Sequence, residues 1–176
     1  MAGREVKLEV EKKRAAHGMC IAPFCDTTTL PPSPPPSHPS AAIHQGILTG
    51  RWTESSQVPG YRKRSRHFGP TDKSRHGEDG HEALLFKTVN ALTAIAAESG
   101  MPLARIALAW PLATDAICCV IAGATKESQV DSNAVAAGTV LSPELLAKLE
   151  EATAELKEAM GSNCDMWQGA GDGRIM

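Results

Sequence analysis

The chain of 176 residues is poor in aromatic side chains, with one tyrosine, three phenylalanines and three tryptophans. Proteins that bind single-stranded nucleic acid stack bases on aromatic rings and attract phosphates with an excess of positive charge. The basic loop over residues 51–80 offers Tyr61 and Phe68 for stacking, but the formal net charge of the chain is −2. We therefore predict no nucleic-acid partner, and we interpret this loop either as a phosphate contact or as a solvated basic loop.

Long apolar runs are also missing, because no stretch approaches the ~18 apolar residues of a membrane span. Residues 1–20 mix acidic and basic side chains, so they lack the apolar core of a secretory signal and are too acidic for a typical transit peptide. The five cysteines are an odd number, which without a signal peptide argues against a disulfide framework. The sequence thus predicts no membrane contact and a reducing, cytoplasmic location.

The usual sequence motifs for metals and phosphates do not occur. Cys20 and Cys25 are not spaced as a structural zinc pair, and no Walker loop or G-x-G-x-x-G pattern is present. The adjacent Cys118 and Cys119 would point to opposite faces of a strand, so we interpret them as buried thiols. The loop histidines have neither zinc-helix spacing nor a triad partner; they are His67, His76 and His81. We therefore predict no metal site.

The composition changes near residue 43. Residues 31–39 are dense in proline, which favours polyproline II or a flexible linker. Residues 6–10 alternate apolar and charged side chains, which indicates a short edge strand or a frayed helix. We predict an atypical, disordered N-terminal region over residues 1–43 and one folded domain over residues 44–176.

Three stretches of the second region have the apolar spacing of amphipathic helices: residues 79–99, residues 102–112 and a stretch after Ser142. Gly100 suits the end of the first helix, and Ser142 followed by Pro143 suits the start of the third. A single strand cannot cover the apolar stripes of all three helices. We therefore expect a marginally stable, mostly helical chain that self-associates through exposed apolar helix faces.

The predicted strand covers residues 117–122, an apolar and β-branched run that is typical of a strand buried on both faces. Gly123 permits a tight turn after it, and Thr125 is a candidate cap for a helix that begins at Lys126. The N-terminus of such a helix carries free N–H groups and the positive end of the helix dipole, which suits a phosphate. The sequence therefore places a candidate anion site directly after the strand.

Lys126, Gln129 and Asn133 follow at i, i+3 and i+7, so we expect them to share one face of this helix. A cation suits a phosphate, and two carboxamides suit the polar edge of a heterocycle. The spacing alone favours another interpretation, in which this is an ordinary connection between strand and helix with a solvated polar face.

Five segments, in order, carry a resemblance to a known family. They read QGILTGRW, ARIALAW, VIAGA, QVDSN and LSPE, over residues 45–52, 104–110, 120–124, 129–133 and 141–144. From about His44 onward, the chain resembles the last part of an aldo-keto reductase. The resemblance implies an incomplete (β/α)8 TIM barrel of the α/β class, made of the end of strand seven, strand eight and the surrounding helices.

Aldo-keto reductases use NADPH to reduce carbonyls, so the resemblance implies NADP(H) as cofactor and a small carbonyl compound as substrate. The family's catalytic Asp, Tyr, Lys and His belong to the first half of the barrel, which lies outside the matching segments. Tyr61 falls in the loop after strand seven and is not that tyrosine. We therefore predict no catalytic residue in this chain and expect it to be inactive alone.

The resemblance also assigns the cofactor contacts. Residues after the strand would line the adenosine half, with Lys126 near the 2′-phosphate, and loop residues would lie near the pyrophosphate. The assigned positions are Gln45, Arg51, Gly123, Thr125, Lys126, Gln129, Ser132 and Asn133, with Tyr61 and Lys63 beside Arg51. The alternative is a non-catalytic fragment, or a module that binds a nucleotide or a protein weakly.

Overall fold

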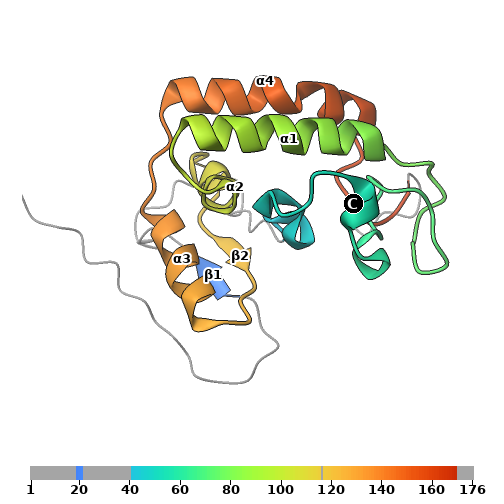
Figure 1. Ribbon diagram of the computed structural model, residues 1–176, viewed down its shortest axis with the longest axis horizontal. Coiled ribbons are helices and arrows are strands. Elements are labelled where there is room, and N and C mark those ends of the chain that lie inside the picture. Colours follow the sequence, from blue (N-terminus) through green and yellow to red (C-terminus); the bar gives the residue numbers. More distant parts are fainter. Residues whose placement is uncertain (1–18, 22–40, 116, 170–176) are drawn as a thin grey trace, which may run out of the picture.

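The computed structural model describes residues 19–21, 41–115 and 117–169. Four α-helices are the main regular elements of this part of the chain (Figure 1). They are α1 (Glu82–Glu98), α2 (Leu103–Leu112), α3 (Glu127–Ala137) and α4 (Pro143–Met160), and the two short strands are β1 (Met19–Ile21) and β2 (Val120–Ala122). Short 3₁₀ turns cover His44–Thr49, Ser55–Gln57 and Gly60–Arg62.

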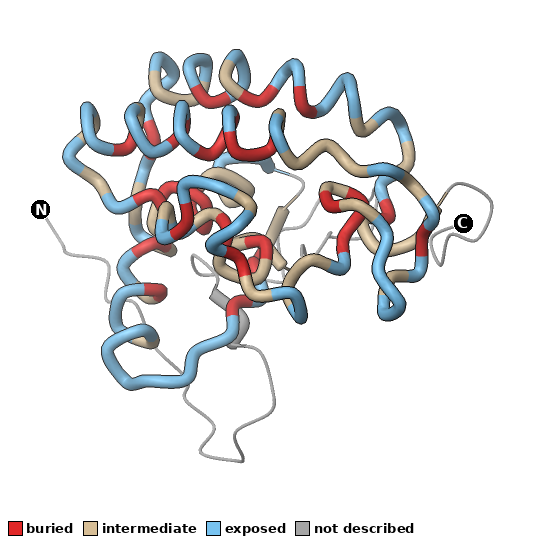
Figure 2. Tube along the Cα trace, turned by 45° about the vertical axis from the view of Figure 1, so that its right-hand side comes forward, coloured by how far each residue is buried: buried red, intermediate tan, exposed pale blue. Residues whose placement is uncertain are grey.

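α1 and α4 lie side by side and form a layer over the other described elements (Figure 1). Leu85, Val89 and Leu92 of α1 are buried, as are Leu149 and Leu156 of α4, because the apolar stripes of the two helices face each other. Figure 2 shows the same pattern, with buried residues on the inner sides of the helices and exposed residues along their outer turns. α1 and α4 therefore bury each other's apolar stripes. The sequence analysis had found no element to cover these stripes.

The three predicted amphipathic helices are confirmed. α1 lies within the predicted range, α2 begins directly after Pro102, and α4 begins at Pro143. The hydroxyl of Ser142 accepts a hydrogen bond from the N–H of Leu145 at 3.2 Å, which caps α4 as expected. Gly100 follows α1 with a φ of +68°, a left-handed conformation that favours glycine.

β2 is shorter and more open than the sequence predicted. Val120 and Ala122 are buried against α2 and α3, together with Leu108 and Ala136. Ile121 lies between them and is 39% exposed, since alternate residues of a strand point to opposite faces. The prediction of a strand buried on both faces was therefore wrong. In the described residues, helices cover one face of β2 and the other face is open.

β1 lies beside β2 and next to α3 (Figure 1). The two strands pair in antiparallel register, with Met19 opposite Ala122 and Ile21 opposite Val120. The sequence predicted one convincing strand, so this partner was missed. All strands of a (β/α)8 barrel are parallel, so the β1–β2 pair is not a piece of such a barrel. Residues 1–18 and 22–40 of the N-terminal region, which include the stretches 6–10 and 31–39, lie outside the described residues.

Some large apolar side chains stay exposed in the described part of the chain: Tyr61, Ile121, Val135 and Val140. Two of them belong to α3 and to the connection that follows it. The exposed apolar surface of the helices is therefore smaller than the sequence suggested, and self-association stays a prediction.

No single helix within the described residues is long and apolar enough to cross a membrane. α1 and α2 together reach the necessary length and composition, but they are bent by 94° at their junction.

Candidate nucleotide-binding site

The candidate anion site lies where β2 ends and α3 begins. Gly123 and Ala124 leave the strand, and α3 starts at Glu127 with Lys126 as its N-cap residue. Lys126 has a φ of −138° and a ψ of 148°, which is extended backbone, and its side chain makes no capping hydrogen bond. The predicted cap at Thr125 and the predicted helix start at Lys126 were therefore wrong by one residue.

Gln129 uses its carboxamide to close the start of α3. Its Oε1 accepts hydrogen bonds from the N–H of Thr125 at 2.8 Å and from the hydroxyl of Thr125 at 3.2 Å. This contact resembles one half of a capping box, in which a side chain at the third helical position reaches back over the helix N-terminus. Gln129 therefore fixes the conformation of the loop that follows Gly123.

Asn133 lies one turn further along α3, and it is 93% buried (7% exposed). Its side-chain nitrogen, Nδ2, has no hydrogen-bond partner within the described structure. A buried donor without a partner costs about 1–3 kcal/mol, so such groups are normally paired with protein, water or a ligand. Among the residues that the structure describes, the buried Nδ2 of Asn133 therefore lacks an acceptor.

The remaining predicted residues of α3 and its loop are exposed: Gly123, Thr125, Lys126, Gln129 and Ser132. The hydroxyl of Ser132 donates to the carbonyl oxygen of Ser128 at 2.8 Å, within the helix. Lys126 stands before the helix and Asn133 faces the protein interior with Ala136, so the three residues expected on one polar face do not share one. The structure does bring Gln129 and Asn133 onto adjacent turns.

The second group of predicted contacts lies in the turn around Gln45. His44, Gln45 and Gly46 have φ values of +46°, +54° and +92°. Non-glycine residues rarely adopt this left-handed conformation, and it clusters at functional sites. The Arg62 guanidinium donates to the carbonyl oxygen of Gln45, and the hydroxyl of Thr49 donates to that of Gly46 at 2.7 Å. These bonds hold the turn through the backbone of Gln45 and not through its carboxamide.

Arg51 is exposed directly after this turn. Its guanidinium carbon lies 5.4 Å from the centroid of the Trp52 ring, and that of Arg62 lies 5.6 Å from the same ring. Both distances suit a cation–π contact. The contacts of Arg51 are with Trp52 and, through its N–H, with the hydroxyl of Thr49, so the structure does not join Arg51 to the α3 residues.

The segment that precedes Gln45 connects the two groups of predicted residues. Ala42 and Ile43 pack against the buried cluster that holds Val120 and Ala122 of β2. The turn that carries Gln45 therefore begins on the same cluster that supports β2 and α3. The structure brings these two segments to one place, whereas Arg51 lies further along the chain beside Trp52.

Lys63 is engaged in contacts within the loop. Its Nζ donates to the hydroxyl of Ser55 at 2.6 Å and lies 3.5 Å from Oε2 of Glu82. Burial alone would raise the pKa of Glu82, but hydrogen bonds from Ser55 and from the N–H of Gly69, with the charge of Lys63, hold that pKa below its usual value. Lys63 would have to leave these partners to meet a phosphate, whereas Tyr61 is exposed.

Two histidines form a contact that no spacing in the sequence indicated. The ring centroids of His44 and His67 lie 4.5 Å apart in an edge-on arrangement, and the hydroxyl of Ser65 lies 3.2 Å from Nε2 of His44. Burial lowers the pKa of His44 to about 4. Burial, together with the charges of His44, Arg66 and His81, lowers the pKa of His67 to about 3. Both rings are therefore neutral at neutral pH.

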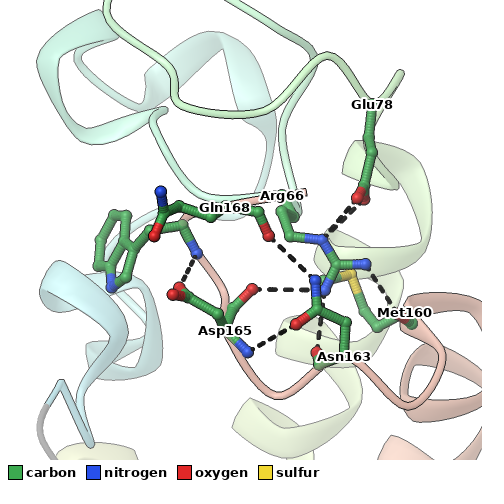
Figure 3. A network of polar contacts seen from close by, with 7 residues as sticks. Arg66, Glu78, Met160, Asn163, Asp165 and Gln168 are labelled. Carbon is green, nitrogen blue, oxygen red and sulfur yellow. Dashed lines mark hydrogen bonds and ion pairs between the residues drawn. The ribbon is translucent and has the colours of Figure 1, made fainter. Parts of the chain in front are cut away.

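Arg66 belongs to the basic loop that the sequence offered to a phosphate, but the structure buries it (Figure 3). Its Nε donates to both carboxylate oxygens of Glu78 at 2.8 Å. Its two terminal nitrogens donate to the carbonyl oxygens of Met160 and Asn163, each at 3.0 Å. Arg66 therefore satisfies the C-terminal end of α4, and its charge is not available to a ligand.

The network around Arg66 continues along the segment after α4 (Figure 3). The side chain of Asn163 donates to the carbonyl oxygen of Gln168 at 3.0 Å, and Oδ1 of Asp165 accepts from the N–H of Trp167 at 2.8 Å. Gln168 also forms an isolated parallel bridge with Arg75. This segment is thus fixed to the basic loop by hydrogen bonds and not by an apolar stripe, which is why its position was not predicted.

Comparison with known proteins identifies the group to which these elements belong. The sequence profile of the aldo/keto reductase family matches residues 37–154. A probable voltage-gated potassium channel subunit beta from Oryza sativa subsp. japonica is 41% identical over 110 residues, which cover 61% of this chain and 32% of that protein. A protein of the same description from Arabidopsis thaliana is 30% identical over 111 residues, which cover 62% of this chain and 32% of that protein.

A solved structure gives the same indication for the fold. The glycerol dehydrogenase of Gluconobacter oxydans superposes with a TM-score of 0.51 at 18% identity, over 66% of this chain and 33% of that one. The chain thus spans about a third of the length of the proteins that it matches. Because the family profile covers more than half of the sequence, the chain belongs to the aldo/keto reductase family.

Proposed function

We propose that this chain forms the adenosine-binding part of an NADP(H) site in an oxidoreductase that interconverts carbonyls and alcohols. The observation that carries the proposal is the buried Nδ2 of Asn133, which has no acceptor in the described structure. An adenine ring offers acceptor nitrogens in a flat, apolar frame, which suits such a donor. Gln129 lies one turn before Asn133 and belongs to the same site.

The 2′-phosphate is proposed to meet the start of α3. Lys126 is exposed there, and the helix lacks the side-chain cap that Ser142 gives to α4. Uncapped N–H groups at the positive end of the helix dipole favour an anion, and a lysine adds a full charge. Preference for NADPH over NADH is the expected consequence, because only NADPH carries this phosphate.

The pyrophosphate is proposed to lie along the turn that carries Gln45, with Arg51 at its end. Arg51 is exposed, and among the described residues no carboxylate forms an ion pair with it. Its place above the Trp52 ring keeps the guanidinium near the turn without neutralising its charge. The proposed NADP(H) contacts therefore also include Gln45 and Arg51, together with Gly123, Thr125 and Ser132.

NADPH, when bound, supplies the hydride, and the protein supplies binding and orientation. Carbonyl reduction also needs a proton donor, and we propose no catalytic residue among those of this chain. The expected behaviour of the chain alone is cofactor binding without turnover of a small carbonyl compound. A cytoplasmic location, where NADPH is available, is part of the same proposal.

Cofactor binding is tested by fluorescence of the purified chain, with quenching and energy transfer from Trp52, Trp110 and Trp167 to NADPH. We expect saturable binding of NADPH, weaker binding of NADH, and at least a tenfold loss of affinity when Gln129 and Asn133 are both replaced by Ala. The matched control is Asn90→Ala, which removes an exposed asparagine of α1. Unchanged affinity in the double variant would remove both residues from the site.

A second candidate is a non-catalytic binding subunit. It is favoured by the 41% identity to the rice protein described as a probable potassium channel subunit beta. The test is co-expression with a plant voltage-gated potassium channel followed by purification through a tag on the channel. Stoichiometric recovery of this chain would support the second candidate, and its absence from the purified channel would remove it.

A further inference from the structure

The turn that carries Gln45 has a backbone conformation that is unfavourable in isolation. His44, Gln45 and Gly46 follow one another with φ values of +46°, +54° and +92°. Left-handed residues other than glycine are strained, and they persist only where surrounding contacts fix them. Gly46 relieves this strain at one of the three positions. The placement of Gln45 therefore depends on the residues that hold this turn.

Arg62 reaches the middle of this turn from a separate segment, the 3₁₀ turn Gly60–Arg62. Its guanidinium donates a hydrogen bond to the carbonyl oxygen of Gln45, 17 positions earlier in the chain. Hydrogen bonds from a charged donor are stronger than those between neutral groups. The hydroxyl of Thr49 holds the next carbonyl oxygen at 2.7 Å, but Thr49 belongs to the same local segment. Arg62 is thus the residue that ties the strained turn to the basic loop.

Two aromatic rings keep the guanidinium of Arg62 in place. Its central carbon lies 5.6 Å from the centroid of the Trp52 ring and 5.3 Å from that of the Tyr61 ring, which suits cation–π contacts. A Cβ atom on Gly46 would lie 3.6 Å from Nη1 of Arg62 and 3.6 Å from an atom of the Trp52 ring. The turn, the buried ring and the guanidinium are therefore packed against one another.

The other contacts of Arg62 give it no different role in the described part of the chain. Its Nε donates to the hydroxyl of Tyr61 at 3.4 Å, and no carboxylate of a described residue forms an ion pair with it. Lys63 differs in this respect, because its Nζ lies 3.5 Å from the carboxylate of Glu82. Removal of the Arg62 side chain should therefore act on the turn and on the two rings, and not on an ion pair elsewhere.

We propose that Arg62 is a positioning residue for the pyrophosphate part of the candidate nucleotide site, which rests on the function proposed above. It fixes the turn of Gln45 in the conformation that meets the pyrophosphate, and it does so without touching the ligand. The adenosine part of the site belongs to α3, with Gln129 and Asn133, and has no contact with Arg62. Loss of Arg62 should therefore weaken only those ligands that carry the pyrophosphate.

Two ligands separate the two parts of the site. NADPH spans both, whereas adenosine 2′,5′-bisphosphate has the adenine and the 2′-phosphate but lacks the pyrophosphate. Isothermal titration calorimetry of the purified chain measures each affinity. We expect Arg62→Met to bind NADPH at least tenfold more weakly and adenosine 2′,5′-bisphosphate within twofold of the unaltered chain. The matched control Arg64→Met removes an exposed arginine of the same loop and should change neither affinity.

The variant Gly46→Ala tests whether Arg62 acts through the turn. A side chain at a φ of +92° strains the turn, while its Cβ atom remains at an ordinary contact distance from Arg62. We expect Gly46→Ala to weaken NADPH binding at least fivefold. The double variant of Gly46→Ala with Arg62→Met should lose no more than the larger single loss, because both changes disturb the same turn. A loss equal to the product of the two single losses would overturn the positioning role.

The remaining outcomes distinguish this role from the proposed function. Unchanged NADPH affinity in Arg62→Met, or an equal loss for both ligands, would overturn the positioning role and leave the proposed function in place. Absence of binding of both ligands to the unaltered chain would overturn the proposed function, and the positioning role with it. Circular dichroism checks the helix content of each variant. If Arg62→Met loses it, Arg62→Lys, which keeps the charge but not the planar stacked group, decides by the same two affinities.

Discussion

The Oε1 atom of Gln129 accepts a hydrogen bond from the N–H of Thr125 at 2.8 Å. The contact links the first turn of α3 to the loop that leaves β2, across the helix end where we place the 2′-phosphate. Gln129 thus has two roles. Its Oε1 atom holds the loop through Thr125, and its whole carboxamide is proposed to contact the adenosine part of NADPH. Substitutions that keep the oxygen but change the rest of the group can separate these roles.

Gln129→Ala is expected to lower the free energy of unfolding by about 0.5–1 kcal/mol, the lower part of the range for lost helix caps, because the residue is exposed. Gln129→Glu keeps an acceptor and places a negative charge in the first turn, which the helix dipole favours, so its stability should match that of the unaltered chain. Both substitutions should weaken NADPH binding. Urea unfolding and NADPH titration on the same samples measure the two effects. Equal destabilisation by Ala and Glu would contradict the capping role.

Arg66→Met is expected to lower the free energy of unfolding by about 3 kcal/mol, because it leaves the half-buried carboxylate of Glu78 and the carbonyl groups at the end of α4 without their buried donor. Arg66→Lys should recover only part of this loss, since an ammonium cannot reproduce the two-sided guanidinium contacts. The matched control is Arg64→Met in the same loop, where the arginine is exposed. Chemical denaturation followed by circular dichroism gives the three values, and a loss for Arg64→Met as large as that for Arg66→Met would contradict the assignment.

The pH dependence of stability follows from His44 and His67. Their pKa values are lowered to about 4 and about 3, from 6.5 in the unfolded chain, so the unfolded chain binds more protons below pH 6.5. The contribution of these two histidines to the free energy of unfolding should therefore be constant above pH 6.5. It should fall as the pH decreases from 6.5 toward 4. Each histidine contributes a slope of up to about 1.4 kcal/mol per pH unit.

Substitution of His44 or His67 by Gln should flatten this fall. His81→Gln leaves both buried rings in place and removes only the smallest cause of the lowered pKa of His67, so it should retain most of the fall. Urea unfolding at intervals between pH 7 and pH 4.5 measures the slope. Identical profiles for the unaltered chain and for the variant His67→Gln would show that the ring at position 67 is not kept neutral by burial.

The sequence identified the helices and the family because both depend on local patterns. Apolar stripes and end residues such as Ser142 and Gly100 act within a few positions of the chain, and they placed α1, α2 and α4 correctly. Two of the segments that carry the family resemblance, VIAGA and QVDSN, coincide with β2 and α3. These signals do not depend on how distant parts of the chain pack.

Other features were missed because long-range packing decides them. β1 meets β2 across about one hundred residues, and nothing in a three-residue strand indicates its partner. The sequence suggests that Arg66 is one of several solvated charges in a basic loop. In the structure it is buried and donates to carbonyl groups at the end of α4. Asn133 was expected on an exposed polar face, but α3 is turned so that this carboxamide faces the interior. In each case, the environment of the residue or strand is set by an element that is distant in the sequence or by the way its own helix packs.

The two faces of β2 should respond differently to loss of side-chain volume. Val120 is fully buried among α2 and α3, so Val120→Ala is expected to lower the free energy of unfolding by about 2 kcal/mol through lost burial and the cavity left behind. Ile121 is 39% exposed, so Ile121→Ala removes more atoms but should cost less than Val120→Ala, because part of the Ile121 side chain already meets water. Denaturant unfolding of the two variants under identical conditions compares them directly. A larger loss for Ile121→Ala would mean that the open face of β2 is covered in solution, for which a second copy of this chain would be the first candidate to examine by light scattering.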